Sequence, residues 1–217
     1  MALLAALTIP AIQSSTRKAW TTQDMTKLRQ IGQAAQAYAS DNNGRLPNIE
    51  SPIPGTSLSS TQPDRFDWQE AVDRYLPPVA TFQAASIYNY FRRSEIWTSK
   101  FAQPYPGWTS NPDYHSPPGP TAFAGNQRIN DLNWRGYISR IPKPSQIVIV
   151  GEVNGRTGLN PGLAPDMVGN KQSYYRVNRP GGAALYLFAD CHIEELVGDQ
   201  SEPALKAAGK PNIWRWW

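Results

Sequence analysis

The chain has 217 residues, of which 40% are hydrophobic and 18% charged, and its formal net charge is +4. This length fits one domain with appendages, and the 20 prolines and 16 glycines indicate many turns and ordered loops, not a helical bundle. The basic residues are scattered, so nucleic acid is not an expected partner. One cysteine and two histidines exclude a zinc site built from three histidines.

The first twelve residues, MALLAALTIPAI, form an apolar tip without a charged side chain. The run is too short to span a bilayer, which takes about 20 apolar residues as a helix. No lysine or arginine precedes it, so it does not fit a secretory signal. Pro10 is expected to kink a helix here without ending it. The side chains expected to pack helix against helix are Leu3, Leu4, Leu7, Ile9, Pro10 and Ile12.

An amphipathic shaft follows the tip and is expected to run to about residue 40. Its apolar residues recur at spacings of three and four, which indicates one helical face directed at a globular head. That face comprises Leu28, Ile31, Ala35 and Tyr38. Gly44 can take the left-handed conformation that ends a helix. We therefore predict a helical unit at 1–46 and a head at 47–217; an ordinary core helix of a soluble domain is the alternative.

The head is expected to contain long Pro/Gly-rich loops and a late sheet. Two apolar runs, 146–150 and 183–188, predict strands, and residues 193–197 can pair back on the second of them. Asp190 and Cys191 would then be the two central residues of a tight hairpin. The predicted class is α+β, with one long helix packed on a C-terminal antiparallel sheet.

Asp190, Cys191 and His192 could form a reactive site or a turn. A Cys/His nucleophile pair needs facing side chains, whereas neighbours in an extended chain point to opposite faces. A turn is therefore preferred, no catalytic residue is assigned, and a hydrolase using Cys191 is a minor alternative. Asp190, Glu194 and Asp199 could supply oxygen ligands to calcium, but a solvated acidic face is the preferred explanation. No other cofactor or metal is expected.

Aromatic residues suggest a second function. Tyr105 and Trp108 lie in a Pro-rich loop, and three tryptophans crowd the last four residues, 214–217. Such rings can stack on sugars, so the alternative is a cell-surface module that binds glycans. Packing of the rings into the head or into a neighbouring subunit is the other interpretation.

Several segments resemble the type IV pilin-like and type II secretion pseudopilin proteins. LLAALTIPAI, at 3–12, is similar to the second half of the family's hydrophobic helix with its kinking proline. KLRQIGQAAQAYASDNNGRLP, at 27–47, resembles a helix of the form L-x-Q-I-G-x-A-x-x-x-Y that ends at a D-N-x-G-x-x-P turn. Weaker likenesses are FAGN at 123–126 and IPKPSQIVIV at 141–150, with Glu152 where an Asp is usual.

Residues 179–194 resemble the family's C-terminal signature, R-H-x-G-G-A-N-x-L-F-A-D-G-H-V-E. Arg179 and the run 187–190 match it, but Pro180 stands in place of its histidine and Cys191 in place of its Asp-Gly glycine. If that glycine has a positive φ in the family, Cys191 is expected to be strained or its turn remodelled.

The resemblance implies a non-enzymatic subunit, pilin or pseudopilin, of a periplasmic or extracellular filament. It implies a pilin-like fold, self-association through the N-terminal helix, and assembly from the bacterial inner membrane by a pilus or secretion machine. The family's peptidase motif, the Phe that follows it and the assembly glutamate do not occur in the sequence. We expect that this processed and methylated part is encoded upstream of Met1.

Overall fold

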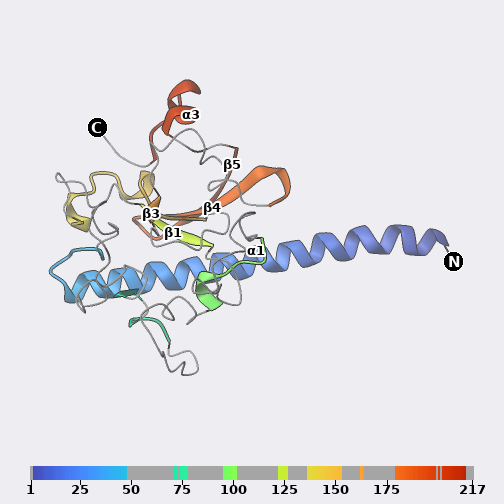
Figure 1. The fold of residues 1–217 in the computed structure, drawn as a ribbon, viewed down its shortest axis with the longest axis horizontal. Helices are drawn as coiled ribbons and strands as arrows, with labels where there is room; N and C mark the ends of the chain where they lie inside the picture. The colour runs from blue at the N-terminus through green and yellow to red at the C-terminus, as the bar shows by residue number, and fades with distance from the viewer. Residues whose placement is uncertain are drawn as a thin grey trace, which may run out of the picture.

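In the part of the chain that the computed structural model describes, a five-stranded sheet packs on the second half of a long N-terminal helix (Figure 1). The general class is α+β, as predicted. The structure describes residues 2–47, 71–72, 74–77, 95–101, 122–126, 136–152, 162–163, 179–198, 200 and 202–213.

Helix α1, Ala2–Asp41, is 40 residues long, which corresponds to about 60 Å at 1.5 Å per residue. It continues through Pro10, as predicted, and the kink expected there stays a prediction. Proline has no backbone N–H, so the carbonyl of Ala6 lacks the donor that an interior helical residue would supply. Figure 1 shows one continuous rod whose N-terminal end lies far from the sheet.

The end of α1 has the left-handed geometry expected from its sequence. The Gly44 N–H donates to the Ala39 carbonyl at 2.7 Å, and Asn43 and Gly44 have φ of 55° and 79°. This bond spans five residues, as in the Schellman type of helix end. The following backbone pairs with the head, because the Leu46 N–H donates to the Gly136 carbonyl at 2.8 Å.

The strands lie in the order β3-β1-β2-β4-β5. Their bounds are β1 Phe123–Asn126, β2 Val148–Glu152, β3 Gly162–Leu163, β4 Ala183–Phe188 and β5 Ile193–Val197. The neighbouring strands are antiparallel, as predicted, except for the β1–β3 pair, which is parallel. The sequence FAGN of β1 contains no β-branched residue, so its strand character is set by pairing with β2.

One face of the sheet packs on the apolar stripe of α1. Leu28 and Ile31 are fully buried, and they share a core cluster with Leu185 and Leu187 of β4. Ala35 is buried there too. Burial of such side chains contributes about 1.5–3 kcal/mol each for leucine or isoleucine, which explains why this half of the helix holds the head. Tyr38, the last predicted member, is half-buried and packs edge-to-face on Tyr75.

The opposite face of the sheet is also covered. Tyr186 and Phe188 of β4 form a second core cluster with Leu205 of helix α3, Glu202–Ala207. All six residues of β4 are consequently buried. From the sequence we expect one long helix packed on the sheet, without a second layer being predicted. A continuous apolar run such as AALYLF is typical of a strand buried on both sides, and this signal points to the second layer.

The β4–β5 hairpin turns one residue earlier than predicted. The Cys191 N–H donates to the Phe188 carbonyl at 2.9 Å, and the Phe188 N–H donates to the His192 carbonyl at 2.9 Å. Ala189 and Asp190 are therefore the central turn residues, and Cys191 follows with φ of 68°. A type I turn followed by a left-handed residue is the usual three-residue hairpin loop. The positive φ expected at Cys191 is confirmed.

The hairpin loop packs on α1 at Gly32. A Cβ placed on Gly32 would lie 3.1 Å from Cδ2 of Leu187 and 3.3 Å from Sγ of Cys191. A side chain at this helical position would require Leu187 and Cys191 to give way by a few tenths of an ångström. Glycine, although unfavourable inside a helix by about 1 kcal/mol relative to alanine, thus permits the close approach of hairpin and helix.

Two substitutions of Cys191 should distinguish how much its strained backbone and its packed sulfur each contribute to the free energy of unfolding. Cys191→Ala loses the sulfur contact with α1 but keeps a Cβ at positive φ, so it should be less stable than wild type. Cys191→Gly should be about 1 kcal/mol more stable than Cys191→Ala, because only the Cβ resists this φ. Urea denaturation measures both free energies of unfolding. The exposed strand residue Glu195 is the control, because Glu195→Gly should be less stable than Glu195→Ala.

Candidate assembly surface and helix–head junction

The first candidate functional feature is the part of α1 that extends beyond the head. Every residue from 10 to 19 is exposed, and Ile12 retains 64% of its accessible surface. We call these residues the projecting segment. Figure 1 shows that α1 continues past the sheet in this direction. The side chains of Leu3, Leu4, Leu7 and Ile9 lie outside the described part of the structure, although their backbone is helical.

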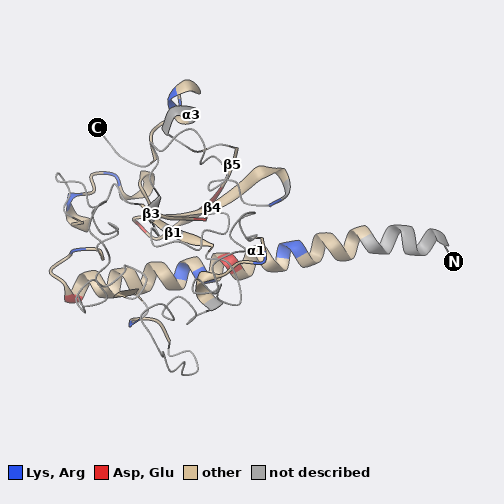
Figure 2. Cartoon of the chain, in the orientation of Figure 1, with Lys and Arg blue, Asp and Glu red and all other residues tan. Residues whose placement is uncertain are grey.

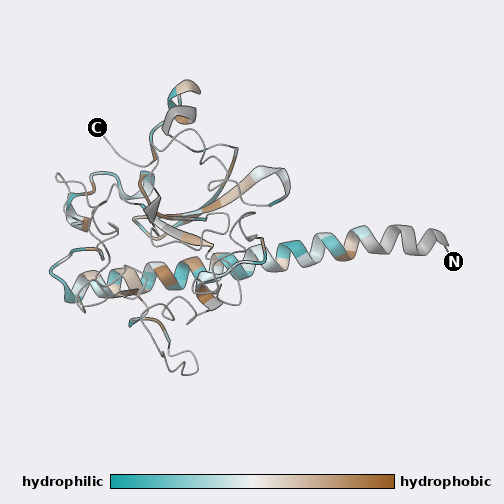
Figure 3. Cartoon of the chain, in the orientation of Figure 1, coloured by the Kyte–Doolittle hydropathy of each residue, from teal (hydrophilic) through white to brown (hydrophobic). Residues whose placement is uncertain are grey.

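Threonine hydroxyls in this segment and just after it bond to the helix itself. The hydroxyls of Thr16, Thr21, Thr22 and Thr26 each donate to the carbonyl four residues earlier, at 2.9–3.1 Å. Figure 3 shows hydrophilic and hydrophobic residues mixed along it. Over the described residues, no helix has an apolar stretch long enough to cross a membrane. Helices with internally bonded hydroxyls and small residues can approach one another closely.

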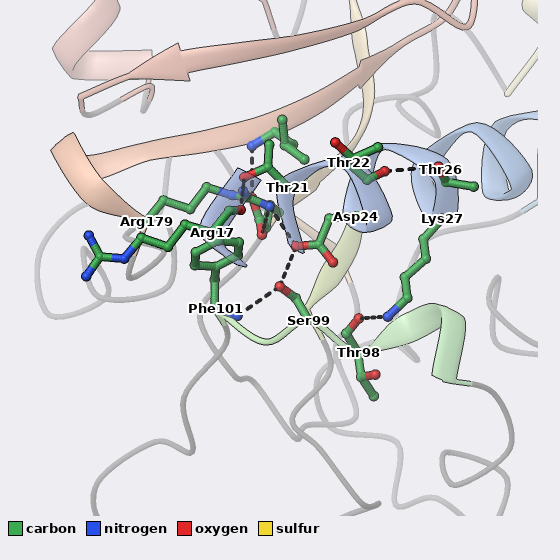
Figure 4. A network of polar contacts seen from close by, with 12 residues as sticks. Arg17, Thr21, Thr22, Asp24, Thr26, Lys27, Thr98, Ser99, Phe101 and Arg179 are labelled. Atoms are coloured by element: carbon green, nitrogen blue, oxygen red, sulfur yellow. Dashed lines mark hydrogen bonds and ion pairs between the residues drawn. The ribbon is translucent and has the colours of Figure 1, made fainter. Parts of the chain in front are cut away.

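The second feature is a buried ion-pair network where the helix meets the head (Figure 4). Nε of Arg179 donates to Oε2 of Glu152 at 2.7 Å, and Nη2 donates to Oε1 at 3.0 Å. Nη2 also donates to Oδ2 of Asp24 at 2.7 Å. Glu152 ends β2, Asp24 is in α1, and Arg179 precedes β4. The arginine fork thereby joins three segments that are far apart in the sequence.

Further contacts enclose the network. The Arg179 guanidinium carbon lies 4.1 Å from the centroid of the Phe101 ring, and Nη1 donates to the Thr21 hydroxyl at 2.8 Å. The Ser99 hydroxyl donates to Oδ2 of Asp24 at 2.6 Å. Trp20 packs edge-to-face on Phe101, and it marks the level at which α1 leaves the head. Both carboxylates and the guanidinium are therefore held in fixed geometry.

Burial dominates the electrostatics of the network. It raises the pKa of both Asp24 and Glu152 above their ordinary values, and the hydrogen bonds and charge of Arg179 oppose that rise only in part. Two carboxylates face one guanidinium, so the cluster has an excess of negative charge when both are ionised. The Lys27 ammonium, which donates to the Thr98 carbonyl at 2.7 Å, also acts to lower the pKa of Asp24.

Sequence reasoning does not bring these residues together. Arg179 matches the C-terminal signature and Glu152 stands where an Asp is usual, but neither pattern assigns a contact. Asp24 does not stand out, because a lone acid on an amphipathic helix usually faces water. A charge within the head-facing stripe, four residues before Leu28, is the available signal.

The predicted turn residues have separate roles. Nδ1 of His192 lies 2.6 Å from Oδ1 of Asp190, and its ring stacks on Phe188. Sγ of Cys191 instead approaches the helix at Gly32, so the thiol and the imidazole have different neighbours. Burial, followed by the charge of Asp190, raises the pKa of the Cys191 thiol. Both findings disfavour an activated cysteine.

The calcium candidates do not form a site within the described residues, which contain no group of three or more metal-binding side chains. Asp190 is bonded to His192, and Glu194 is an exposed residue of β5. Asp199 lies outside the described residues. The candidates for stacking on sugars also lie outside the described residues; these are Tyr105, Trp108 and the tail at 214–217.

Removal of Arg179 should strongly destabilise the fold. Arg179→Met leaves two buried carboxylates without their cation, which should lower the free energy of unfolding by about 3–5 kcal/mol. Arg179→Lys keeps the positive charge but loses the bidentate contact with Glu152, so it should lower the free energy of unfolding by an intermediate amount. Arg140→Met, at an exposed arginine that also lies over an aromatic ring, is the matched control and should change stability by less than about 1 kcal/mol. Equal losses at both arginines would refute the role of the network.

The network should also make the fold more stable in mild acid. A carboxyl group whose pKa is raised by folding takes up a proton in the folded state first, so stability rises as pH falls through the folded pKa toward the unfolded value of about 4. Urea denaturation at pH 7 and pH 5 should show this gain in wild type. It should shrink in Asp24→Asn, which leaves one anion facing one cation. An unchanged difference between the two pH values in the variant would contradict the prediction.

Comparison of the chain with models of known protein families, with curated proteins and with solved structures found no match. The likeness to pilins and pseudopilins therefore stays a prediction from the residue patterns quoted above.

Proposed function

We propose that the chain is a structural subunit, a pilin or pseudopilin, of a filament of the type IV pilus or type II secretion class. The observation that carries the proposal is the division of α1 into two halves. One half is packed on the sheet through Leu28, Ile31 and Ala35, while the projecting segment is exposed on every residue. A helix that continues several turns beyond its own domain has the form needed to pack against copies of itself.

The chemistry of the projecting segment supports close packing between helices. Its sequence, PAIQSSTRKA, is dominated by small side chains, and Thr16 is bonded to its own helix. Small residues let helix backbones approach, and a hydroxyl already bonded needs no water when it is covered. Ile12 adds an exposed apolar side chain, one of two large ones found over the described residues.

The rigid junction supports the same role. An assembling subunit transmits the position of its helix to its head only if the two do not move independently. The buried contacts of Arg179 with Asp24 and Glu152 join them just behind the point where α1 leaves the head. The head would then occupy one orientation on the outside of the filament.

We extend the proposal to the route of assembly on the basis of the family resemblance. The subunit would be held in the bacterial inner membrane and delivered by a pilus or secretion machine to a periplasmic or extracellular filament. The genomic DNA directly upstream of the Met1 codon tests this part. It should encode in frame a short basic leader, a glycine and a Phe-Thr-Leu-x-Glu start, and a different upstream sequence would argue against it.

Charge introduced into the projecting segment should prevent assembly without unfolding the subunit. Ile12→Glu would place an anion in a helix interface, so filaments seen by electron microscopy of the producing cells should fall at least about tenfold. Thermal unfolding of the purified chain should stay unchanged, because residue 12 is exposed. Gln36→Glu, at an exposed position on the half of α1 that carries the head, is the control and should assemble normally. Producing cells of wild type without filaments would refute the function itself.

A further inference from the structure

Arg17 and Lys18 are the only charged residues among the first 23 of the chain, and both are exposed. Figure 2 shows a basic band on α1 close to where the helix leaves the head. No acidic residue stands three or four positions before or after either cation, so neither has an ordinary helical ion-pair partner. Neither side chain forms an ion pair with another described residue. If the segment is covered on assembly, these charges require an anionic partner.

Arg17 lies on the continuation of the stripe that faces the head. It precedes Thr21 by four residues, Asp24 by seven and Leu28 by eleven, which places all four on one side of the helix. Thr21, Asp24 and Leu28 contact the head of the same copy. Lys18 is about 100° further round the helix, because each residue turns by 360°/3.6. In a bundle of parallel helices, Arg17 would therefore face the head of a copy displaced along the axis.

Among the described strand residues, one exposed acid lies on the corresponding side of the sheet. Glu195 pairs with Leu185, whose side chain packs against α1, so Glu195 projects from the same face of the sheet as Leu185. Glu194 pairs with Tyr186 and projects from the other face. Both glutamates are exposed, and β5 is an edge strand. Of these two acids, Glu195 is thus the one directed toward the layer in which the helices lie.

A neighbouring apolar side chain distinguishes this patch from an ordinary solvated edge. Val197, two residues after Glu195 and on the same face, retains 65% of its accessible surface. An exposed valine beside a carboxylate gives the patch both an apolar and an anionic contact. This combination fits a helix face that carries small residues and one cation, Arg17.

Resting on the proposed function, we propose that the projecting segment of one copy docks beside β5 of a second copy, where its Arg17 pairs with Glu195. The occupant is a second copy because every copy in a filament presents the same cation on a helix parallel to α1. The charges complement each other, and opposed charges chiefly determine register and exclude wrong alignments. The contact would fix how far each subunit is displaced along the filament.

Charge reversal with a swap tests the pair in cells that assemble the full chain. Arg17→Glu alone and Glu195→Arg alone should each reduce sheared filaments at least about tenfold, because each places like charges together. The double variant Arg17→Glu/Glu195→Arg should recover most of the wild-type amount. Arg29→Glu, at an exposed arginine on the half of α1 that carries the head, and Glu194→Arg make the same charge changes outside the proposed contact and should assemble normally. All sites are exposed, so thermal unfolding of each purified variant should match wild type.

The other outcomes would contradict the proposed contact between Arg17 and Glu195. Normal filaments from both single reversals would do so while leaving the proposed function intact. A second outcome is that Arg17→Glu loses filaments, Glu195→Arg does not restore them, and the purified Arg17→Glu variant binds anionic phospholipid vesicles more weakly. That outcome would show that Arg17 binds lipid headgroups instead of Glu195. Loss of filaments in Arg29→Glu and Glu194→Arg to the same extent would show a general charge effect. Failure of wild type to form filaments would remove the function together with the contact.

Discussion

The structure depends on the burial of Arg179 between two carboxylates. Its guanidinium binds Glu152 through two nitrogens and reaches Asp24 on the helix, so a strand, a helix and the loop before β4 meet at one residue. Removing these charges from water costs several kcal/mol for each ion, and the cost is offset only because nearly every donor direction is used. The arrangement favours a single relative position of helix and head. Apolar packing alone along a straight stripe would allow the helix to slide.

A second constraint acts at the other end of the contact between helix and sheet. Gly32 lets Leu187 and Cys191 approach α1 more closely than any other residue would permit. The hairpin, in turn, needs a left-handed residue at position 191, which the chain supplies with cysteine. The strained backbone and the half-buried sulfur are thus coupled: the side chain that makes the turn unfavourable also packs on the helix.

Local patterns predict the parts of this structure that depend on neighbouring residues. The helical stripe, the end of α1 near Gly44 and the strands β4 and β5 follow from periodicity, a glycine and apolar runs. These patterns do not predict β1, because Phe123 is its only strand-favouring residue and its strand character is set by pairing with β2. The predicted hairpin has Asp190 and Cys191 as its central residues, but Ala189 and Asp190 occupy those positions. The sequence alone allows either placement of the turn. The network of Arg179 joins residues up to 155 positions apart, and no spacing within one sequence reports such a contact.

The exposed half of α1 gains its significance from the rigidity of the other half. A projecting helix on a mobile junction would present its side chains in many orientations, and association would have to select one of them at an entropic cost. Here Asp24 and Leu28 fix the rotation of the helix about its axis, so the direction of Arg17 is set before any partner arrives. The same contacts fix the strand that carries Glu195. In the proposed filament, buried charges within one subunit would therefore determine which exposed charges can meet between two.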